Sequence, residues 1–152
     1  MGAKTLKPVR AKLYDEDFAV WTSETARLLR AGRFDEVDIE HVAEEIEDMG
    51  NRGKRELDSR LTVLIVHLLK WKWQPEKKSE SWRSTIVTQR SELRRLFAQS
   101  PSLKAKVQDA VEQVYSDAVE GAMAETSLPA RTFPRNCPFT ADQILDRDFL
   151  PK

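Results

Sequence analysis

The sequence predicts an all-α fold, a single-domain helical bundle of about four main helices with an extended, proline-rich C-terminal strap and a short last helix. Apolar residues recur at spacings of three and four, only 5 of the 152 residues are glycine, and β-branched residues seldom alternate with polar ones as they do in strands. The length fits one hydrophobic core, because single cores commonly hold about 100 to 150 residues. We therefore expect a flexible basic arm over residues 1–12 and one helical domain over residues 13–152.

The first two helices are indicated by their end signals. The first is expected from Asp15 to about Ala31, with Gly32 as a C-terminal breaker. A second helix should begin after Asp38, a good N-cap, and run to Trp73, with a break between residues 50 and 53 left open. Its later half includes "LTVLIVHLL", residues 61–69, and should be the central buried element. That run falls short of the roughly 20 residues that cross a bilayer, so we expect a soluble protein with no membrane partner.

The stretch "HVAEEIEDMG", residues 41–50, gathers acidic side chains beside a histidine on the second helix. At 100° per residue the acids fall on the side of His41, and the other face carries an apolar stripe, which we expect to pack inward while the carboxylates face solvent. A carboxylate metal site in a bundle takes inward-facing ligands from several helices, usually with two Glu-x-x-His pairs. The chain has a single Asp38-x-x-His41 here, so we predict no metal site. The apolar stripe consists of Ile39, Val42, Ala43, Ile46 and Met49.

Proline and capping signals divide the remainder of the chain. Residues 74–81 form a connection, and a third helix follows from Trp82. Ser100, followed by proline, offers an N-cap for a fourth helix that ends near Thr126. Residues 127–139 hold three prolines and should cross the bundle as an extended strap, anchored by Phe133 and Phe139. A capping box formed by Thr140 and Gln143 then begins the short last helix.

Charge is segregated along the chain although the net charge is zero. Residues 14–50 hold 12 acidic and 3 basic side chains, a net charge of −9, whereas residues 51–106 hold 14 basic and 5 acidic ones, a net charge of +9. Such opposition either joins elements inside the fold or displays two faces to different partners, and the sequence leaves both interpretations open.

Four polar residues on or beside the apolar faces form a candidate polar cluster. They are expected to have partners, because an unmade buried hydrogen bond costs about 1 to 3 kcal/mol. The cluster is either a structural network or a small polar pocket within the bundle. An imidazole titrates near neutrality, so an enzyme or metal-binding bundle that uses the histidine with acidic residues is one alternative function. The four residues are His67, Gln89, Arg90 and Glu125.

Basic and aromatic residues mingle over residues 70–95 and form a candidate basic-aromatic surface. Cations could hold phosphates while tryptophan rings stack on bases, so nucleic-acid binding is a second alternative. The structural interpretation is that the tryptophans fill the core, and a sequence pI near 6.8 is not the basic value of a nucleic-acid binder, so we do not expect nucleic acid as a partner. The surface consists of Lys70, Lys72, Trp73, Lys77, Lys78, Arg83 and Arg94.

The single cysteine, Cys137, cannot form an intrachain disulfide, which favours a reducing, cytoplasmic compartment. It has no CxxC partner and no Cys-His signature, so we interpret it as a buried, inert thiol. Phosphate-cradling GxxxxGK[ST] loops and GxGxxG turns do not occur in the sequence. We therefore assign no catalytic residue, no metal ligand and no cofactor.

The whole chain resembles the bacterial family catalogued as domain of unknown function 29 (DUF29). The resemblance covers about residues 13–151 and is carried by ordered blocks: "YDEDFAVW", "LLRAGRFDEVDIEHVAEEIEDMG", "HLLKWKWQP", "SESWRSTIVTQR", "SPSL", "AETSLP", "FPRNCPFT" and "ILDRDFLP". It implies a compact helical domain in a bacterial cytoplasm and no catalytic residues to carry over. His67 belongs to the shared block "HLLKWKWQP", whereas His41, although it lies inside a quoted block, is at a position that is not part of the family's pattern.

Segregated charge, abundant aromatic residues and the lack of a complete catalytic motif together favour a non-enzymatic protein-interaction or assembly module. Its partner would be another protein or a second copy of the chain. A contiguous apolar patch left exposed by the bundle would be its structural signature.

Overall fold

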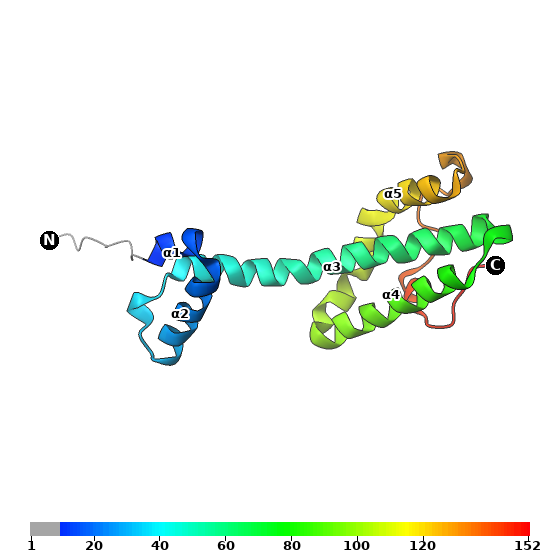
Figure 1. Ribbon diagram of the computed structural model, residues 1–152. Helices are drawn as coiled ribbons and strands as arrows, with labels where there is room; N and C mark the ends of the chain where they lie inside the picture. The colour runs from blue at the N-terminus through cyan, green and yellow to red at the C-terminus, as the bar shows by residue number, and fades with distance from the viewer. Residues whose placement is uncertain (1–9) are drawn as a thin grey trace. The chain divides into compact units, whose positions relative to one another are not determined.

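The computed structural model describes residues 10–152, and over this range the chain is helical with no strand (Figure 1). Four helices of 13 to 35 residues and a short last one confirm the predicted all-α class with about four main helices. The α-helices are α1 Arg10–Glu16, α2 Phe18–Arg30, α3 Ile39–Trp73, α4 Glu80–Gln99, α5 Val107–Thr126 and α6 Ala141–Leu145. Short 3₁₀ turns separate them: η1 Phe34–Glu36, η2 Pro75–Lys77, η3 Pro101–Lys106 and η4 Ala130–Thr132.

The chain divides into two compact units, the first ending at Gly50 and the second comprising Asn51–Lys152. The expectation of one domain over residues 13–152 stays a prediction. The expected basic arm, residues 1–12, lies outside the described residues as far as residue 9, and its last three residues begin α1. Within residues 10–152, every helix is too short or too polar to span a lipid bilayer.

In the first unit, the prediction of a single helix that begins at Asp15 is wrong, because Asp17 separates α1 from α2. The Asp17 side chain accepts a hydrogen bond from the backbone N–H of Val20 at 3.0 Å and so caps α2. The helix ends as expected, since Gly32 has a φ of +71°, a conformation that suits glycine. Within residues 12–50 the buried apolar residues are few: Trp21, Leu28 and Val37.

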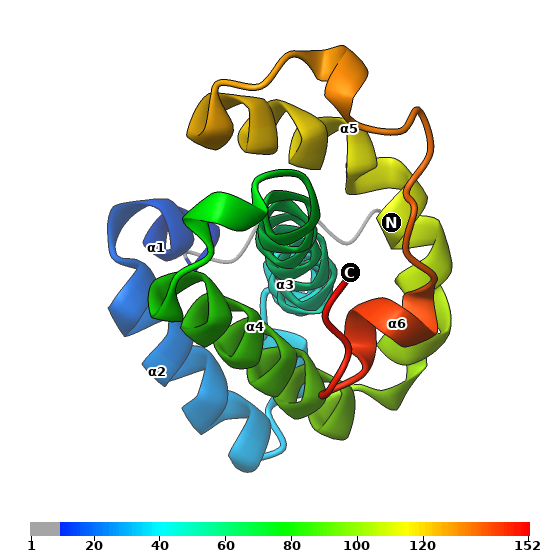
Figure 2. The same ribbon diagram turned by 90° about the vertical axis from the view of Figure 1, so that its right-hand side faces the viewer.

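The second unit is built around the later half of α3, which confirms the expected central element. Figure 2 looks along α3, with α4 and α5 on two sides of it and α6 near a third. Leu61, Leu64, Leu68 and Leu69 have no exposed surface. The helix runs unbroken through its two glycines, because no residue between Gly50 and Gly53 leaves the helical conformation.

Small residues on α5 let it approach α3 closely. Ala118 and Ala122 are fully buried, and a Cβ added to Gly121 would lie 2.9 Å from Cγ2 of Val66. Packing on α3 therefore depends on the absence of a side chain at Gly121.

The other end of α5 departs from expectation: a 3₁₀ helix begins at Pro101, and Ser100 makes no side-chain cap.

The strap, residues 127–139, crosses the second unit after α5 ends at Thr126, and its first residue, the C-cap Ser127, has a φ of 61° that reverses the chain. Phe133 and Phe139 are both buried, which confirms the two expected anchors. Thr140 and Gln143 form the expected capping box at the start of α6, although the helix has only five residues. The strap is therefore fixed by two rings and by the cap that follows it.

Candidate functional site

His67 and Glu125, two members of the candidate polar cluster, have different bonding partners. His67 Nδ1 donates to the Val63 carbonyl oxygen of its own helix at 2.9 Å, and burial lowers the pKa of the imidazole. Glu125 accepts a hydrogen bond from Lys70 Nζ at 2.8 Å, and the two form a salt bridge between α5 and α3. The Glu125 carboxylate thus neutralises a buried lysine.

Gln89 and Arg90, the other two members, lie on α4. Gln89 accepts a hydrogen bond from Arg60 Nη1 at 3.3 Å. Arg90 is buried and donates from Nε to the Ile144 carbonyl oxygen at 2.8 Å and from Nη2 to the Gln143 carbonyl oxygen at 3.2 Å. These are carbonyls of α6, which lack partners within so short a helix. Among residues 10–152, no hydrogen bond joins two of the four cluster members, and each has a structural partner of its own.

Each of the three tryptophans within residues 70–95 has a lysine ammonium group over its ring. Lys70 Nζ lies 4.3 Å from the centre of the Trp82 ring, Lys78 Nζ lies 4.9 Å from that of Trp71, and Lys72 Nζ lies 5.2 Å from that of Trp73. Each pair is within the range of a cation–π interaction. The three tryptophan rings that could have stacked on nucleic-acid bases therefore already have lysine neighbours.

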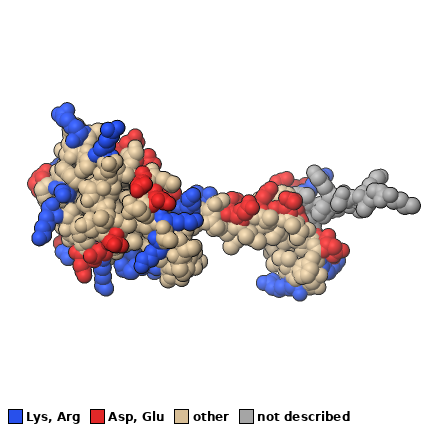
Figure 3. Space-filling model, turned by 180° about the vertical axis from the view of Figure 1, so that it is seen from behind, with Lys and Arg blue, Asp and Glu red and all other residues tan. Residues whose placement is uncertain are grey.

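The remaining members of the surface point to solvent but are not concentrated. Lys77, Arg83 and Arg94 are exposed, whereas Lys70 is buried. In Figure 3 basic side chains of the second unit alternate with acidic ones on the face shown. A phosphate backbone is bound best by a stripe of one sign, so this distribution does not favour a nucleic acid.

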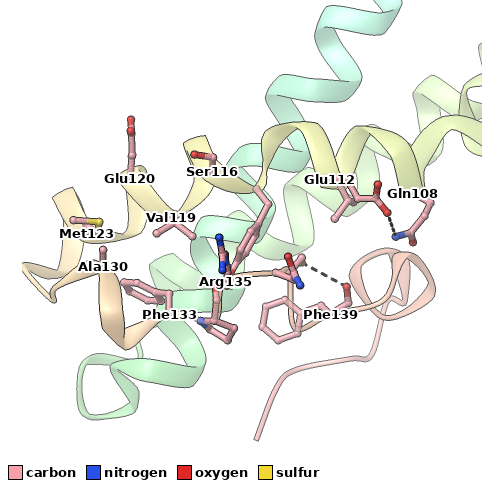
Figure 4. Close-up of a pocket in the computed structure, with 15 residues that line it drawn as sticks. Gln108, Glu112, Ser116, Val119, Glu120, Met123, Ala130, Phe133, Arg135 and Phe139 are labelled. Carbon is pink, nitrogen blue, oxygen red and sulfur yellow. Dashed lines mark hydrogen bonds between the residues drawn. The ribbon is translucent and has the colours of Figure 1, made fainter.

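A cleft of about 970 Å³ opens between α5 and the strap, and sequence reasoning missed it. Figure 4 shows α5 along one side and residues 130–139 along the other. Valines and phenylalanines line its inner part, and Glu112, Glu120 and Arg135 are exposed at its edge. The predicted strap beside a helix was the only signal for this groove.

The two titratable groups inside the cleft, Tyr115 and Cys137, are not prepared for chemistry at neutral pH. Tyr115 Oη donates to the Pro134 carbonyl oxygen at 2.6 Å, and burial raises the pKa of its phenol to about 12. Cys137 Sγ donates to the Phe139 carbonyl oxygen at 3.5 Å, and burial likewise raises the pKa of the thiol. A protonated thiol is a poor nucleophile, which agrees with the interpretation of Cys137 as inert.

In the first unit, the prediction that the apolar stripe at the start of α3 packs inward is wrong, whereas most of the carboxylates there face solvent as expected. The apolar stripe faces solvent: Ile39, Ile46 and Met49 are 58%, 63% and 64% exposed. We call these three residues the apolar ridge. The acidic side chains of the same turns are also exposed: Glu40, Glu44, Glu47 and Asp48.

The side of these turns that holds Asp38, His41 and Glu45 is packed, because aromatic residues from α1 and α2 meet it. The Tyr14 ring stacks on His41 at 3.9 Å between centres, and Trp21 meets both rings edge-on. Tyr14 Oη donates to Glu45 at 2.6 Å, and that bond raises the pKa of the phenol to about 12. A hydrogen bond to buried Asp38 raises the pKa of His41. Aromatic stacking and these bonds therefore select the polar face of α3 for the interior of the first unit.

Among the described residues, no group of three or more His, Cys, Asp or Glu side chains could hold a metal ion. Asp38 and His41 instead form a hydrogen bond at the start of α3, which is an ion pair when the imidazole is protonated. Their arrangement fixes the imidazole under Tyr14 and leaves the apolar ridge on the outer side of the helix.

Comparisons with known proteins give the family of the chain and nothing on its activity. Searches of curated proteins and of solved structures found no match. A scan against protein families matches residues 13–150 to the one described as "Domain of unknown function DUF29". The match covers most of the chain, so the protein belongs to the DUF29 family.

Proposed function

We propose that this protein is a non-enzymatic protein-interaction or assembly module that binds its partner through the first unit. One observation carries the proposal. Eight large apolar side chains are exposed among the described residues, and seven of them lie before residue 50. They are Phe18, Val20, Leu29, Phe34, Ile39, Ile46 and Met49, and the eighth is Val87.

The first unit exposes apolar surface where it has little core. Among residues 12–50, whose side chains the structure describes, the buried ones are Trp21, Thr25, Leu28, Val37 and Asp38. Domains below about 40 residues usually need further help to be stable, and this unit, Met1–Gly50, is close to that limit. Full burial of an isoleucine or methionine contributes about 1.5 to 3 kcal/mol, so a partner that covers the apolar ridge would supply stabilisation of the size that the unit lacks.

The geometry gives less support to the alternatives. An enzyme or metal site that uses His67 would need an acid beside the imidazole, and its Nδ1 is bonded to a backbone carbonyl while Glu125 pairs with Lys70. Nucleic-acid binding through residues 70–95 would need free tryptophan faces, and lysines lie over them. The free thiol of Cys137 supports action in a reducing compartment, for which we propose the cytoplasm.

The proposal is tested by site-specific photo-cross-linking in the organism that encodes the chain. A benzophenone amino acid replaces Ile46 in one variant and Val87 in a matched control, because both side chains are exposed and apolar but only Ile46 lies in the first unit. We expect a discrete cross-linked protein from position 46 and none from position 87. An absence of cross-links at position 46 would refute a function based on this surface.

A further inference from the structure

We infer that the segment that occupies the apolar ridge is a cationic amphipathic helix of another protein. The inference rests on the proposed function and adds the chemistry of the partner. It depends on two properties of the first unit: the spacing of the exposed apolar side chains and the charge around them.

The spacing of the ridge is that of a helix-packing face. Ile39 and Ile46 are seven residues apart, and Met49 follows three residues later. Half-buried Val42 completes an i, i+3, i+7, i+10 series on the same side. This is the apolar pattern with which one helix packs along another, and it extends about 15 Å at 1.5 Å per residue. A partner helix of three to four turns is long enough to cover it.

The charge around the ridge selects a cation. Glu40 and Glu47 lie on one edge of the stripe, about 100° to 120° from Ile46, and Glu44 and Asp48 lie farther round the helix. Figure 3 shows acidic side chains along the opening turns of α3. Residues 14–50 together carry a net charge of −9. Lysines or arginines beside the apolar stripe of a partner would meet these carboxylates and give complementary potentials across the contact.

The same charge disfavours other occupants of the ridge. An anionic membrane surface or a nucleic acid would approach carboxylates of its own sign. A second copy aligned in parallel would place Glu40 and Glu47 against the same residues of its twin, which is destabilising at short range. Residues 51–60 carry basic side chains, but Leu57 and Gly53 face the interior of the second unit, so the exposed positions there offer a second copy no apolar counterpart to the ridge.

The test uses two synthetic peptide helices of about 14 residues, roughly 20 Å long, with one identical leucine stripe. One peptide carries lysines on its polar face and the other carries glutamates. Fluorescence anisotropy measures the binding of each labelled peptide to the full chain. We expect the lysine peptide to bind at least about tenfold more tightly than the glutamate peptide, and we expect the difference to shrink at high salt.

Variants locate the binding on the ridge. The double variant Ile39→Ser/Ile46→Ser should lose at least about tenfold in affinity for the lysine peptide, whereas Val87→Ser should change the affinity by less than about twofold. The double variant Glu40→Lys/Glu47→Lys should reverse the preference in favour of the glutamate peptide. All substituted side chains are exposed, so circular dichroism at 222 nm should be unchanged and a loss of binding is not a loss of fold.

Three results would overturn the inference. Equal affinity for both peptides would show that charge does not select the partner, and binding of neither peptide would show that the ridge does not accept a cationic helix. A dimer in analytical ultracentrifugation that Ile46→Ser abolishes would show that a second copy occupies the ridge. In each case the photo-cross-link at position 46 still decides the proposed function separately, because it requires a partner at the ridge but not a cationic one.

Discussion

The substitution Arg90→Met removes the bonds that fix α6 to α4 while it keeps the aliphatic part of the side chain. The guanidinium is buried and donates to two carbonyl oxygens, at 2.8 Å on Ile144 and at 3.2 Å on Gln143. A hydrogen bond to a charged group contributes about 1.5 to 3 kcal/mol, so two of them amount to roughly 3 to 6 kcal/mol. Removing a buried charge recovers part of its desolvation penalty. We therefore expect the free energy of unfolding to fall by about 3 kcal/mol.

For a chain of this length, 1 kcal/mol corresponds to about 2 to 4 °C in Tm, so Arg90→Met should lower Tm by roughly 6 to 12 °C. Urea unfolding followed by tryptophan fluorescence measures the same change as a lower midpoint with an unchanged m value. Arg94→Met is the matched control, since Arg94 lies one turn later on α4 and is exposed. A loss below about 1 kcal/mol for Arg90→Met, or an equal loss for Arg94→Met, would refute the reasoning.

Three further predictions follow from single contacts. Gly121→Ala should destabilise the second unit by about 1 kcal/mol, because overpacking against Val66 outweighs the gain in helix propensity. Gly50→Ala should instead stabilise the protein by up to about 1 kcal/mol, because no atom lies within 4 Å of its added Cβ. Urea unfolding distinguishes the two signs. Glu125→Gln should lower the free energy of unfolding by about 1 to 2 kcal/mol, because buried Lys70 loses its salt bridge to a half-exposed carboxylate. Glu120→Gln on the same helix should leave the free energy of unfolding unchanged in the same assay. In an NMR pH titration, the His41 resonance should titrate above pH 6.5 and the His67 resonance below it. Protonation of His41 therefore favours the folded state, whereas protonation of His67 opposes it and lowers stability as pH falls below about 6.5. Asp38→Asn should change the titration of His41 alone, and the reverse order of the two histidines would contradict the assignment.

The helices could be predicted because their signals are local. Apolar periodicity marked the later half of α3, and the capping box of Thr140 and Gln143 marked the start of α6. The break at Asp17 was missed because the apolar spacing hides it, although an aspartate three residues before Val20 is an N-cap signal. Aspartate occurs both at N-caps and in the first turn of a helix, so only the extended backbone at Asp17 shows that a new helix begins there.

The orientation of the opening turns of α3 was predicted wrongly for a physical reason. Helical periodicity shows which residues share a face, but the face that packs depends on what another element brings to it. Tyr14 comes from 31 residues before Glu45 and offers both a ring for His41 and a hydroxyl for the carboxylate. Aromatic stacking and charge-assisted hydrogen bonds then favour a face that looks polar in the sequence.

The candidate polar residues could be named from the sequence, but their partners could not. Arg90 bonds backbone carbonyls 53 and 54 residues away, and main-chain acceptors carry no residue identity that a sequence pattern could reveal. Lys70 and Glu125 are 55 residues apart on different helices. Pairing over such separations depends on how α3, α4 and α5 pack, which local patterns do not encode.

Hydroxyl-radical footprinting of Met49 tests most directly whether the exposed ridge of the first unit is a binding surface. The reaction is compared between the purified chain and the same chain inside cells, with Met123, half-buried in the cleft of the second unit, as the internal reference. We predict that oxidation of Met49 relative to Met123 is fast in the purified protein and strongly reduced in cells, because a partner covers the ridge there. An equal ratio of Met49 to Met123 oxidation in both samples would contradict the account.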